Sequence, residues 1–149
     1  MSSLNTGPED RRKDMFTVED LNERGEGKLP GLLGLEFTDL AESYIASQLD
    51  IRDVHLAPNG YLHAATVIAL ADTSCGYGCF TNLPEGAETF TTIELKSNFL
   101  GTAREGTISC QARLAHGGRT TQVWDATVTD SDGRTIALFR CTQMVLYPR

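Results

Sequence analysis

Residues 62–80, LHAATVIALADTSCGYGCF, form the longest helical candidate of this 149-residue chain. The segment is rich in alanine, the residue that favours helix most, and apolar side chains occur on nearly all sides of such a helix. Turn-forming residues bound it, namely Asn59 and Gly60 before it and Asn82, Pro84 and Gly86 after it. We therefore predict one long helix that the rest of the chain buries.

Segments of alternating apolar and polar residues flank this helix, as expected of strands with one buried face. Two of them, around residues 35–37 and 44–51, precede the helix and are typical of a hairpin. Four more follow it, at residues 93–99, 108–114, 123–128 and 137–145, with turn signals at 116–118 and 130–133. Helices do not alternate with the strands as they do in parallel α/β folds. The order predicts an α+β protein whose antiparallel sheet wraps around one central helix.

The N-terminal residues lack the alternating pattern of the predicted strands. Residues 1–12 are polar and predicted as a tail, while Phe16, Val18 and Leu21 are spaced for a short amphipathic helix within residues 15–24. We divide the chain into this tail and short helix, residues 1–28, and a single domain, residues 29–149. No apolar run approaches the roughly 18 residues of a membrane helix, and the N-terminus lacks the apolar core of a signal peptide. We expect a cytoplasmic protein.

Composition and charge exclude some classes of function. With 40% hydrophobic and 22% charged residues the chain is expected to fold, and its net charge of −7 argues against sequence-independent nucleic-acid binding. The charge is uneven, because residues 29–90 hold one base and eight acids, net −7, whereas residues 91–149 hold seven bases and five acids, net +2. The C-terminal part therefore suits a small anionic ligand.

One carboxylate interrupts the apolar central helix. Asp72 shares a helical face with Ile68, Cys75 and Cys79, at steps of four, three and seven residues. Burial disfavours ionisation and removes water from the anion, so such a group is suited to act as a general base or a nucleophile. A structural role, in which Asp72 caps a backbone group or pairs with an arginine, remains the alternative.

The start of the helix is a second candidate feature. Its first backbone N–H groups lack helical partners, and the positive end of the helix dipole can polarise a carbonyl or hold an oxyanion. His63 and Asp72 are nine residues apart, half a turn out of phase, and cannot meet on one helix. A site that uses both the helix start and Asp72 is most easily built from two copies, which predicts a dimer with two sites at its interface.

Other reactive residues are assigned structural roles. The four cysteines are expected to be free, mostly buried thiols, and Cys75 and Cys79 have no further ligand at metal-binding spacing. His55 and His116 fall in predicted loops without a serine or acidic partner in a recognisable order, so a Ser-His-Asp triad is not supported. We predict that both histidines lie on the surface.

Several motifs occur together in the chain from about residue 31 to the C-terminus. The main ones are Gly60-Tyr61-Leu62-His63-Ala64-Ala65 and Leu70-Ala71-Asp72. Shorter ones are Asn98-Phe99-Leu100 with Gly106, Gly118-Arg119-Thr120-Thr121 and Asp132-Gly133-Arg134. Together they resemble one family, the hotdog-fold acyl-CoA thioesterases of the phenylacetate-pathway (PaaI-like) and 4-hydroxybenzoyl-CoA type, and the two main motifs are similar to the family's G-x-x-H-G-G and L-x-D/E.

The resemblance implies roles for individual residues. Asp72 would be the nucleophile or general base, the backbone N–H of Ala64 would polarise the thioester carbonyl, and His63 would orient the loop. Gly60 would lie against the substrate, and the coenzyme A nucleotide would be bound near Arg119, Thr120 and Arg149, to which we add Arg104 for its charge. The family implies no metal and no organic cofactor, because coenzyme A is part of the substrate, and it implies a homodimer at least, with a homotetramer expected.

The chain departs from the family pattern at three places. The two glycines after the histidine are Ala64 and Ala65, which keep the N–H groups but add methyl groups beside the thioester. Ala57 stands where many members have Asn or Gln, and Asn59 is the nearest amide. Gly76 stands where some members have a hydroxyl that holds the water, so the water-orienting residue is unassigned.

We therefore predict an acyl-CoA thioesterase that hydrolyses a medium-chain or aromatic acyl-CoA. Two alternatives remain open at this point. One is a non-catalytic protein that binds acyl-CoA or an aromatic ligand, as the alanines at positions 57, 64 and 65 would suit. The other is an acyl-CoA hydratase, which needs a histidine and an acid placed for proton transfer at the acyl chain.

Overall fold

The computed structural model describes residues 15–149, and the tail predicted for residues 1–12 lies outside them. The described chain forms helices α2 (Val18–Arg24), α3 (Leu29–Leu33) and α4 (Ala64–Thr81) and the short 3-10 helix η1 (Asp53–His55). Its strands are β1 (Glu36–Ala41), β2 (Tyr44–Asp50), β3 (Thr89–Phe99), β4 (Thr107–Gly117), β5 (Thr121–Thr129) and β6 (Thr135–Leu146). The predicted hairpin, central helix and four following strands are confirmed.

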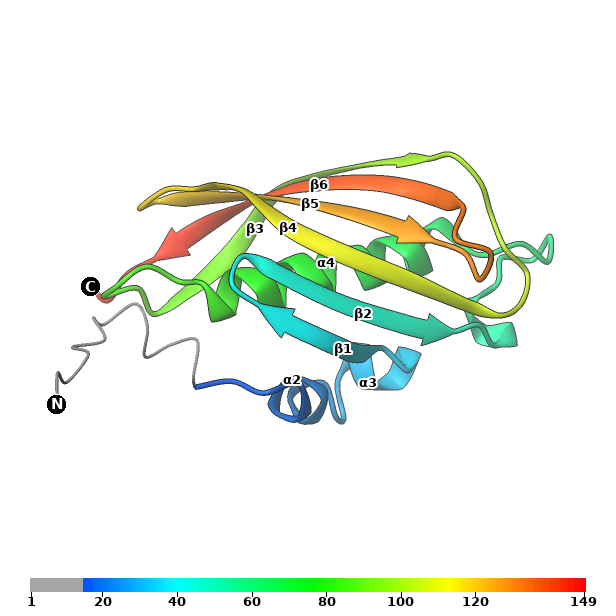
Figure 1. The fold of residues 1–149 in the computed structure, drawn as a ribbon, viewed down its shortest axis with the longest axis horizontal. Coiled ribbons are helices and arrows are strands. Elements are labelled where there is room, and N and C mark those ends of the chain that lie inside the picture. The colour runs from blue at the N-terminus through cyan, green and yellow to red at the C-terminus, as the bar shows by residue number, and fades with distance from the viewer. Residues whose placement is uncertain (1–14) are drawn as a thin grey trace, which may run out of the picture.

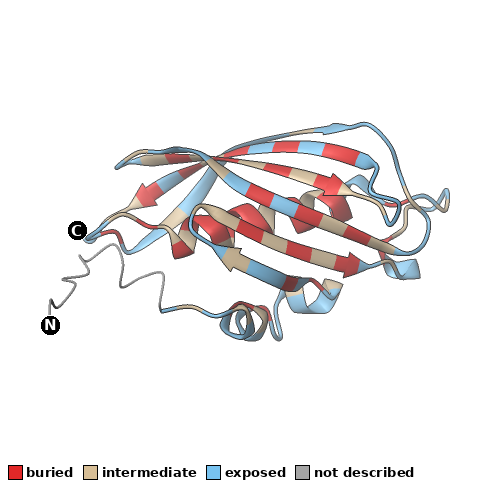
Figure 2. Cartoon of the chain, in the orientation of Figure 1, coloured by how far each residue is buried: buried red, intermediate tan, exposed pale blue. Residues whose placement is uncertain are grey.

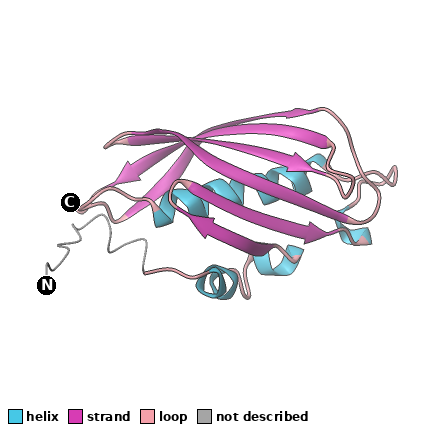
Figure 3. Ribbon diagram, in the orientation of Figure 1, coloured by secondary structure: helices cyan, strands magenta, loops and turns pink. Residues whose placement is uncertain are grey.

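The six strands form one antiparallel sheet in the order β1-β2-β4-β5-β6-β3, and α4 lies along one of its faces (Figure 1). The sheet curves around α4, and helices α2 and α3 lie below the β1 edge (Figure 3). The α+β class is therefore confirmed, and the architecture is that of the hotdog fold. None of the helices in residues 15–149 is long and apolar enough to cross a membrane.

Alternation of burial fixes how the sheet meets the helix. Along β5 every second residue is buried, from Gln122 to Val128, and the same alternation runs along β4 and β6 (Figure 2). The largest buried side chain, Trp124, packs directly on α4 at Gly78, where an added Cβ would lie 2.7 Å from the indole ring. The glycine lets the helix approach the sheet closely at this point.

Polar groups in this part of the core are paired. Ser47 on β2 and Ser74 on α4 lie 2.6 Å apart through their hydroxyl oxygens, and Ser74 also donates to the carbonyl of Leu70 at 2.7 Å. The Trp124 indole donates to Gln122 Oε1 at 2.8 Å. All four cysteines are free and buried, as predicted.

The two edges of the sheet differ. At the β1 edge, Asn22 of α2 binds the backbone of Phe37 twice: its Oδ1 accepts from the Phe37 N–H at 2.7 Å and its Nδ2 donates to the Phe37 carbonyl at 3.2 Å. At the β3 edge no strand follows within the described chain. Large apolar residues on and just after β3 are exposed there, namely Ile93, Leu95, Phe99 and Leu100.

The surface position predicted for His55 is wrong. His55 is fully buried at the end of η1, where its Nδ1 accepts from the Arg52 N–H at 2.8 Å and its Nε2 lies 2.7 Å from the Leu33 carbonyl. The His55 carbonyl in turn accepts from the His63 N–H at 3.0 Å and from the Thr66 hydroxyl at 2.9 Å. The histidine thus joins α3 to the start of α4. His116 is exposed as predicted, but on β4 rather than in a loop.

Candidate active site

The first turn of α4 leaves one backbone donor free. His63 is the N-cap, and its Nδ1 accepts from the Ala65 N–H at 2.9 Å. The Thr66 N–H bonds to the His63 carbonyl at 3.0 Å. Within residues 15–149 the Ala64 N–H has no partner, and Ala64 is exposed. The predicted roles of His63 in orienting the loop and of Ala64 as a donor therefore fit the geometry.

The loop before α4 gathers further predicted residues at the helix start. Asn59 Oδ1 accepts from the Tyr61 N–H at 3.1 Å, and Gly60 has a positive φ of 85°, so the chain turns sharply here. The Arg104 guanidinium carbon lies 4.0 Å from the centre of the Tyr61 ring. Asn59, Gly60 and Arg104 thus lie close to the free donor, although the Asn59 side chain is occupied by the loop itself.

Asp72 lies eight residues beyond Ala64, about 12 Å along the helix axis. Its side chain is half-buried, and burial raises the pKa of the carboxyl above the usual value of an aspartate. Its Oδ1 is buried and has no hydrogen-bond partner in the described part of the chain. Neither the cap nor the arginine pair considered as a structural role is formed within these residues. A carboxylate in this condition is suited to accept a proton or to attack a carbonyl.

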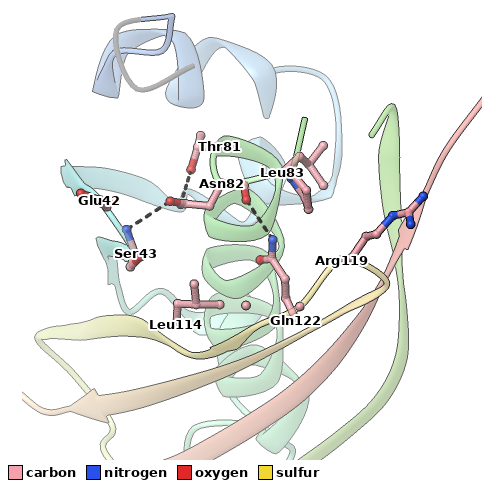
Figure 4. Close-up of a pocket in the computed structure, with 11 residues that line it drawn as sticks. Glu42, Ser43, Thr81, Asn82, Leu83, Leu114, Arg119 and Gln122 are labelled. Atoms are coloured by element: carbon pink, nitrogen blue, oxygen red, sulfur yellow. Dashed lines mark hydrogen bonds between the residues drawn. The ribbon is translucent and has the colours of Figure 1, made fainter. Parts of the chain in front are cut away.

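Of the residues predicted to bind the nucleotide, all except Arg104 lie elsewhere. Arg119 lines a cavity of about 320 Å³ at the C-terminal end of α4, together with the helix cap Asn82 and with Gln122 (Figure 4). The Thr120 carbonyl accepts from the N–H of Val145, near the end of β6, and Arg149 follows that strand by three residues. One chain therefore separates its predicted site residues into a group at each end of α4, with Asp72 between them.

Ser97 has no role predicted from the sequence, yet its hydroxyl oxygen is also buried without a partner in residues 15–149. Ser97 pairs with the buried Phe139 of β6, so its side chain faces the helix side of the sheet. The only signal in the sequence is a small polar residue among the larger residues of a predicted strand. That signal is weak, because serine is common on the solvent faces of strands.

Comparison with known proteins places the chain in a family. Residues 59–137 match the family model described as the thioesterase superfamily. The 1,4-dihydroxy-2-naphthoyl-CoA hydrolase of Escherichia coli is 28% identical over 137 residues, which cover 90% of this chain and 98% of that protein.

Solved structures share the fold. A mutant of thioesterase PA1618 from Pseudomonas aeruginosa superposes with a TM-score of 0.84 at 26% identity, over 88% of this chain and 94% of that one. The PaaI protein of the Escherichia coli phenylacetic acid degradation operon superposes with a TM-score of 0.74 at 20% identity, over 87% of this chain and 96% of that one. At that lower identity the likeness concerns the fold alone.

Proposed function

Because the chain belongs to the thioesterase superfamily and is a thioester hydrolase, we propose that it hydrolyses an acyl-CoA to the free acid and coenzyme A, using Asp72. The observation that carries the assignment of Asp72 is its buried, unpartnered carboxylate oxygen on the central helix. Family membership also favours hydrolysis over the two alternatives, a non-catalytic binder and a hydratase.

Asp72 can act in either of two ways, and both end in the same products. As a general base, it takes a proton from water while the water oxygen bonds to the carbonyl carbon, and the proton then passes to the thiolate that leaves as the C–S bond breaks. As a nucleophile, its carboxylate bonds to the carbonyl carbon and expels the thiolate, and water cleaves the resulting anhydride. In both routes the Ala64 N–H and the positive helix end stabilise charge on the carbonyl oxygen.

A single chain does not bring these two groups together. A carbonyl bound at the Ala64 N–H lies about 12 Å along the helix from Asp72, beyond hydrogen-bonding reach. We propose that the Asp72 of a second copy completes each site. The uncovered β3 edge, with exposed Ile93, Leu95 and Phe99, is the surface that supports this pairing.

The minimal assembly proposed is a homodimer, and we propose a homotetramer as the full one. Leu138 and Met144 are 46% and 40% exposed on the outer face of the sheet, where they are available for a second contact. Light scattering that finds a monomer with full activity contradicts the shared site. A dimer with full activity contradicts only the tetramer.

For the substrate we propose an aromatic or medium-chain acyl-CoA. The Escherichia coli relative is named for an aromatic acyl group, and β3, which lies against α4 where Phe90 meets Gly76, carries exposed apolar residues. Arg119, Thr120, Arg149 and Arg104 are proposed to bind the phosphates of coenzyme A, since guanidinium groups pair well with phosphate. The proposed reaction needs no metal and no organic cofactor.

The test is hydrolysis of a panel of short, medium, long and aromatic acyl-CoAs, with thiol release detected by a chromogenic reagent. We expect turnover of aromatic or medium-chain substrates with kcat of about 1 s⁻¹ or more. Absence of hydrolysis across the panel, from protein that still binds coenzyme A, would overturn the proposal.

A further inference from the structure

Two buried side-chain oxygens in residues 15–149 have no hydrogen-bond partner, Asp72 Oδ1 and Ser97 Oγ. Other hydroxyls on the helix side of the sheet are paired: Ser47 with Ser74, and Thr92 Oγ1 with Gln143 Oε1 at 2.7 Å. Folded proteins rarely leave buried polar atoms unpaired, and those that remain are often bound to water or used in function. The position of Ser97 relative to Asp72 therefore decides what its hydroxyl can do.

Helix α4 and strand β3 run in opposite directions past one another. At the start of α4, the Leu62 N–H bonds to the carbonyl of Ala103, a few residues beyond the end of β3, at 3.0 Å. Near the other end of α4, a Cβ added to Gly76 would lie 3.2 Å from the ring of Phe90, which is at the start of β3. Moving toward the N-terminus of α4 thus corresponds to moving toward the C-terminus of β3.

The strand register places Ser97 one step from a known contact. Cys75 on α4 lies beside Cys141 on β6, whose thiol contributes to the raised pKa of the Cys75 thiol, and Cys141 pairs with Leu95 of β3. From Cys75, Asp72 is three residues, about 4.5 Å, toward the start of the helix. From Leu95, the next inward residue in the same direction is Ser97, about 6.6 Å along β3. Asp72 and Ser97 are therefore at nearly the same level.

The direction in which Asp72 points from the helix axis also places it near Ser97. Cys75 points at β6, and Gly76, about 100° further round, points at β3. Asp72 lies about 60° from Cys75 in the same sense, between these two directions. Its carboxylate thus faces the same strip of the sheet, between β6 and β3, that carries the inward side chain of Ser97.

We propose that Ser97 is a positioning residue of the hydrolytic reaction, whose hydroxyl orients the attacking water for Asp72. One hydrogen of the water is donated to the Asp72 carboxylate and the other to Ser97 Oγ, which leaves a lone pair of the water oxygen directed at the thioester carbon. That oxygen bonds to the carbon, the C–S bond breaks, and the proton taken by Asp72 passes to the departing thiolate. This assignment rests on the proposed function of Asp72.

Helix α4 has no hydroxyl one turn after Asp72 that could hold the water in place of Ser97, because Gly76 occupies that position. The raised pKa of the Asp72 carboxyl, caused by burial, indicates how few polar groups surround it. The Ser97 hydroxyl of the neighbouring strand adds a polar group near Asp72, so that a bound water has a second hydrogen-bond partner. Thr73, next to Asp72 on α4, is the competing hydroxyl, and the experiment has to separate the two.

The test compares Ser97→Ala, Ser97→Thr and Thr73→Val, with Thr92→Val as a matched control on β3 whose hydroxyl already has a partner. For Ser97→Ala we expect kcat to fall about tenfold to a hundredfold, the usual cost of misplaced reacting groups, with KM unchanged. Ser97→Thr should restore most of kcat, and Thr92→Val should leave kcat unchanged. The melting temperature of Ser97→Ala should not fall, because an unpaired buried hydroxyl is removed.

Three results would overturn the assignment of Ser97. They are an unchanged kcat in Ser97→Ala, a loss of kcat in Thr73→Val alone, and a fall in melting temperature or in dimer content of Ser97→Ala that accounts for its lost activity. Asp72→Asn, measured alongside, keeps the two proposals separate. If Asp72→Asn loses turnover while Ser97→Ala does not, only the role of Ser97 is wrong, whereas unchanged turnover in Asp72→Asn removes the proposed function of Asp72 itself.

Discussion

Two faces of helix α4 differ in whether their buried polar groups have hydrogen-bond partners. Where α4 meets the middle of the sheet, Ser74 shares a hydrogen bond with Ser47 and also bonds to the Leu70 carbonyl. Where α4 faces the β3 edge, Asp72 and Ser97 keep buried oxygens without partners in the described chain. The first face shows that this fold readily satisfies buried hydroxyls.

This difference in hydrogen bonding predicts that one face of α4 contributes to the stability of the fold and the other to the proposed activity. A satisfied hydroxyl pair contributes to folding, whereas an unpaired carboxylate costs free energy that folding does not recover. We infer that substitutions on the paired face change the free energy of unfolding and leave turnover of the folded protein intact. Substitutions on the unpaired face should do the reverse.

The largest effect is expected for Asp72→Asn. The amide keeps the shape but neither accepts a proton nor attacks a carbonyl, so kcat/KM should fall by about a thousandfold. The free energy of unfolding at neutral pH should be unchanged or slightly higher, because a partly desolvated charge is removed. Steady-state thiol release and urea unfolding measure the two quantities, and unchanged hydrolysis contradicts the assignment.

Gly78→Ala is expected to give the next largest effect, and on stability alone. Alanine favours helix by about 1 kcal/mol over glycine, but here its Cβ would lie 2.7 Å from the Trp124 ring, and overpacking of this kind typically costs 1–3 kcal/mol or more. We expect a net loss of up to about 2 kcal/mol in urea unfolding. Gly101→Ala, whose Cβ would meet only an ordinary 3.5 Å contact with Ile136, is the control. A stable Gly78→Ala variant with reduced kcat would break the separation of the two faces.

A smaller loss, about 1 kcal/mol, is expected for Ser74→Ala, because Ser47 then loses its side-chain partner. The double variant Ser47→Ala and Ser74→Ala should recover part of this loss, since no orphaned hydroxyl remains. The double-mutant cycle uses unfolding free energies. Strictly additive losses would show that the two hydroxyls are not coupled, which contradicts the 2.6 Å contact.

The most subtle effect is a pH dependence of the stability difference between the wild type and Asp72→Asn. The folded-state pKa of Asp72 is raised by burial, so this group favours folding below its unfolded pKa and loses that contribution as pH rises through the folded value. The advantage of Asn over Asp should therefore grow as pH rises from acid to neutral. kcat should also rise over this range as the base form appears.

Asp125 provides a control of opposite sign. Hydrogen bonds from Arg140, at 2.6 and 2.8 Å, lower its pKa, so its contribution is present at neutral pH and lost in acid. The stability difference between the wild type and Asp125→Asn should therefore shrink in acid. Equal slopes for the two variants would contradict the environments described for both carboxylates.

The elements that the sequence predicted well are those with long regular patterns. The apolar run at residues 62–80 and the alternating segments after it gave the central helix and the order of strands to within a few residues. Asp72 was found because a charge inside such a run has a high cost. These signals lie within short stretches of sequence, so they can be recognised without knowing which residues contact them in the folded chain.

The features that were missed depend on distant contacts. His55 is polar and lies in a connecting segment, so only its bonds to Arg52, Leu33 and the start of α4 show that it is buried. Ser97 was missed because serine is common on the solvent faces of strands, and only its place opposite Phe139 of β6 and the burial of its hydroxyl distinguish it. The separation of Arg104 from Arg119 likewise follows from where the sheet places two loops.

The Asn22 side chain at the β1 edge has a consequence for the proposed pairing of copies through the sheet. By bonding to both the N–H and the carbonyl of Phe37, it occupies the backbone groups that an incoming strand would use. The described chain thus has one edge with open backbone groups and one whose groups are occupied at Phe37. In the proposed dimer, edge-to-edge addition therefore stops after a single event, and the sheet ends at a closed pair and does not continue into a filament.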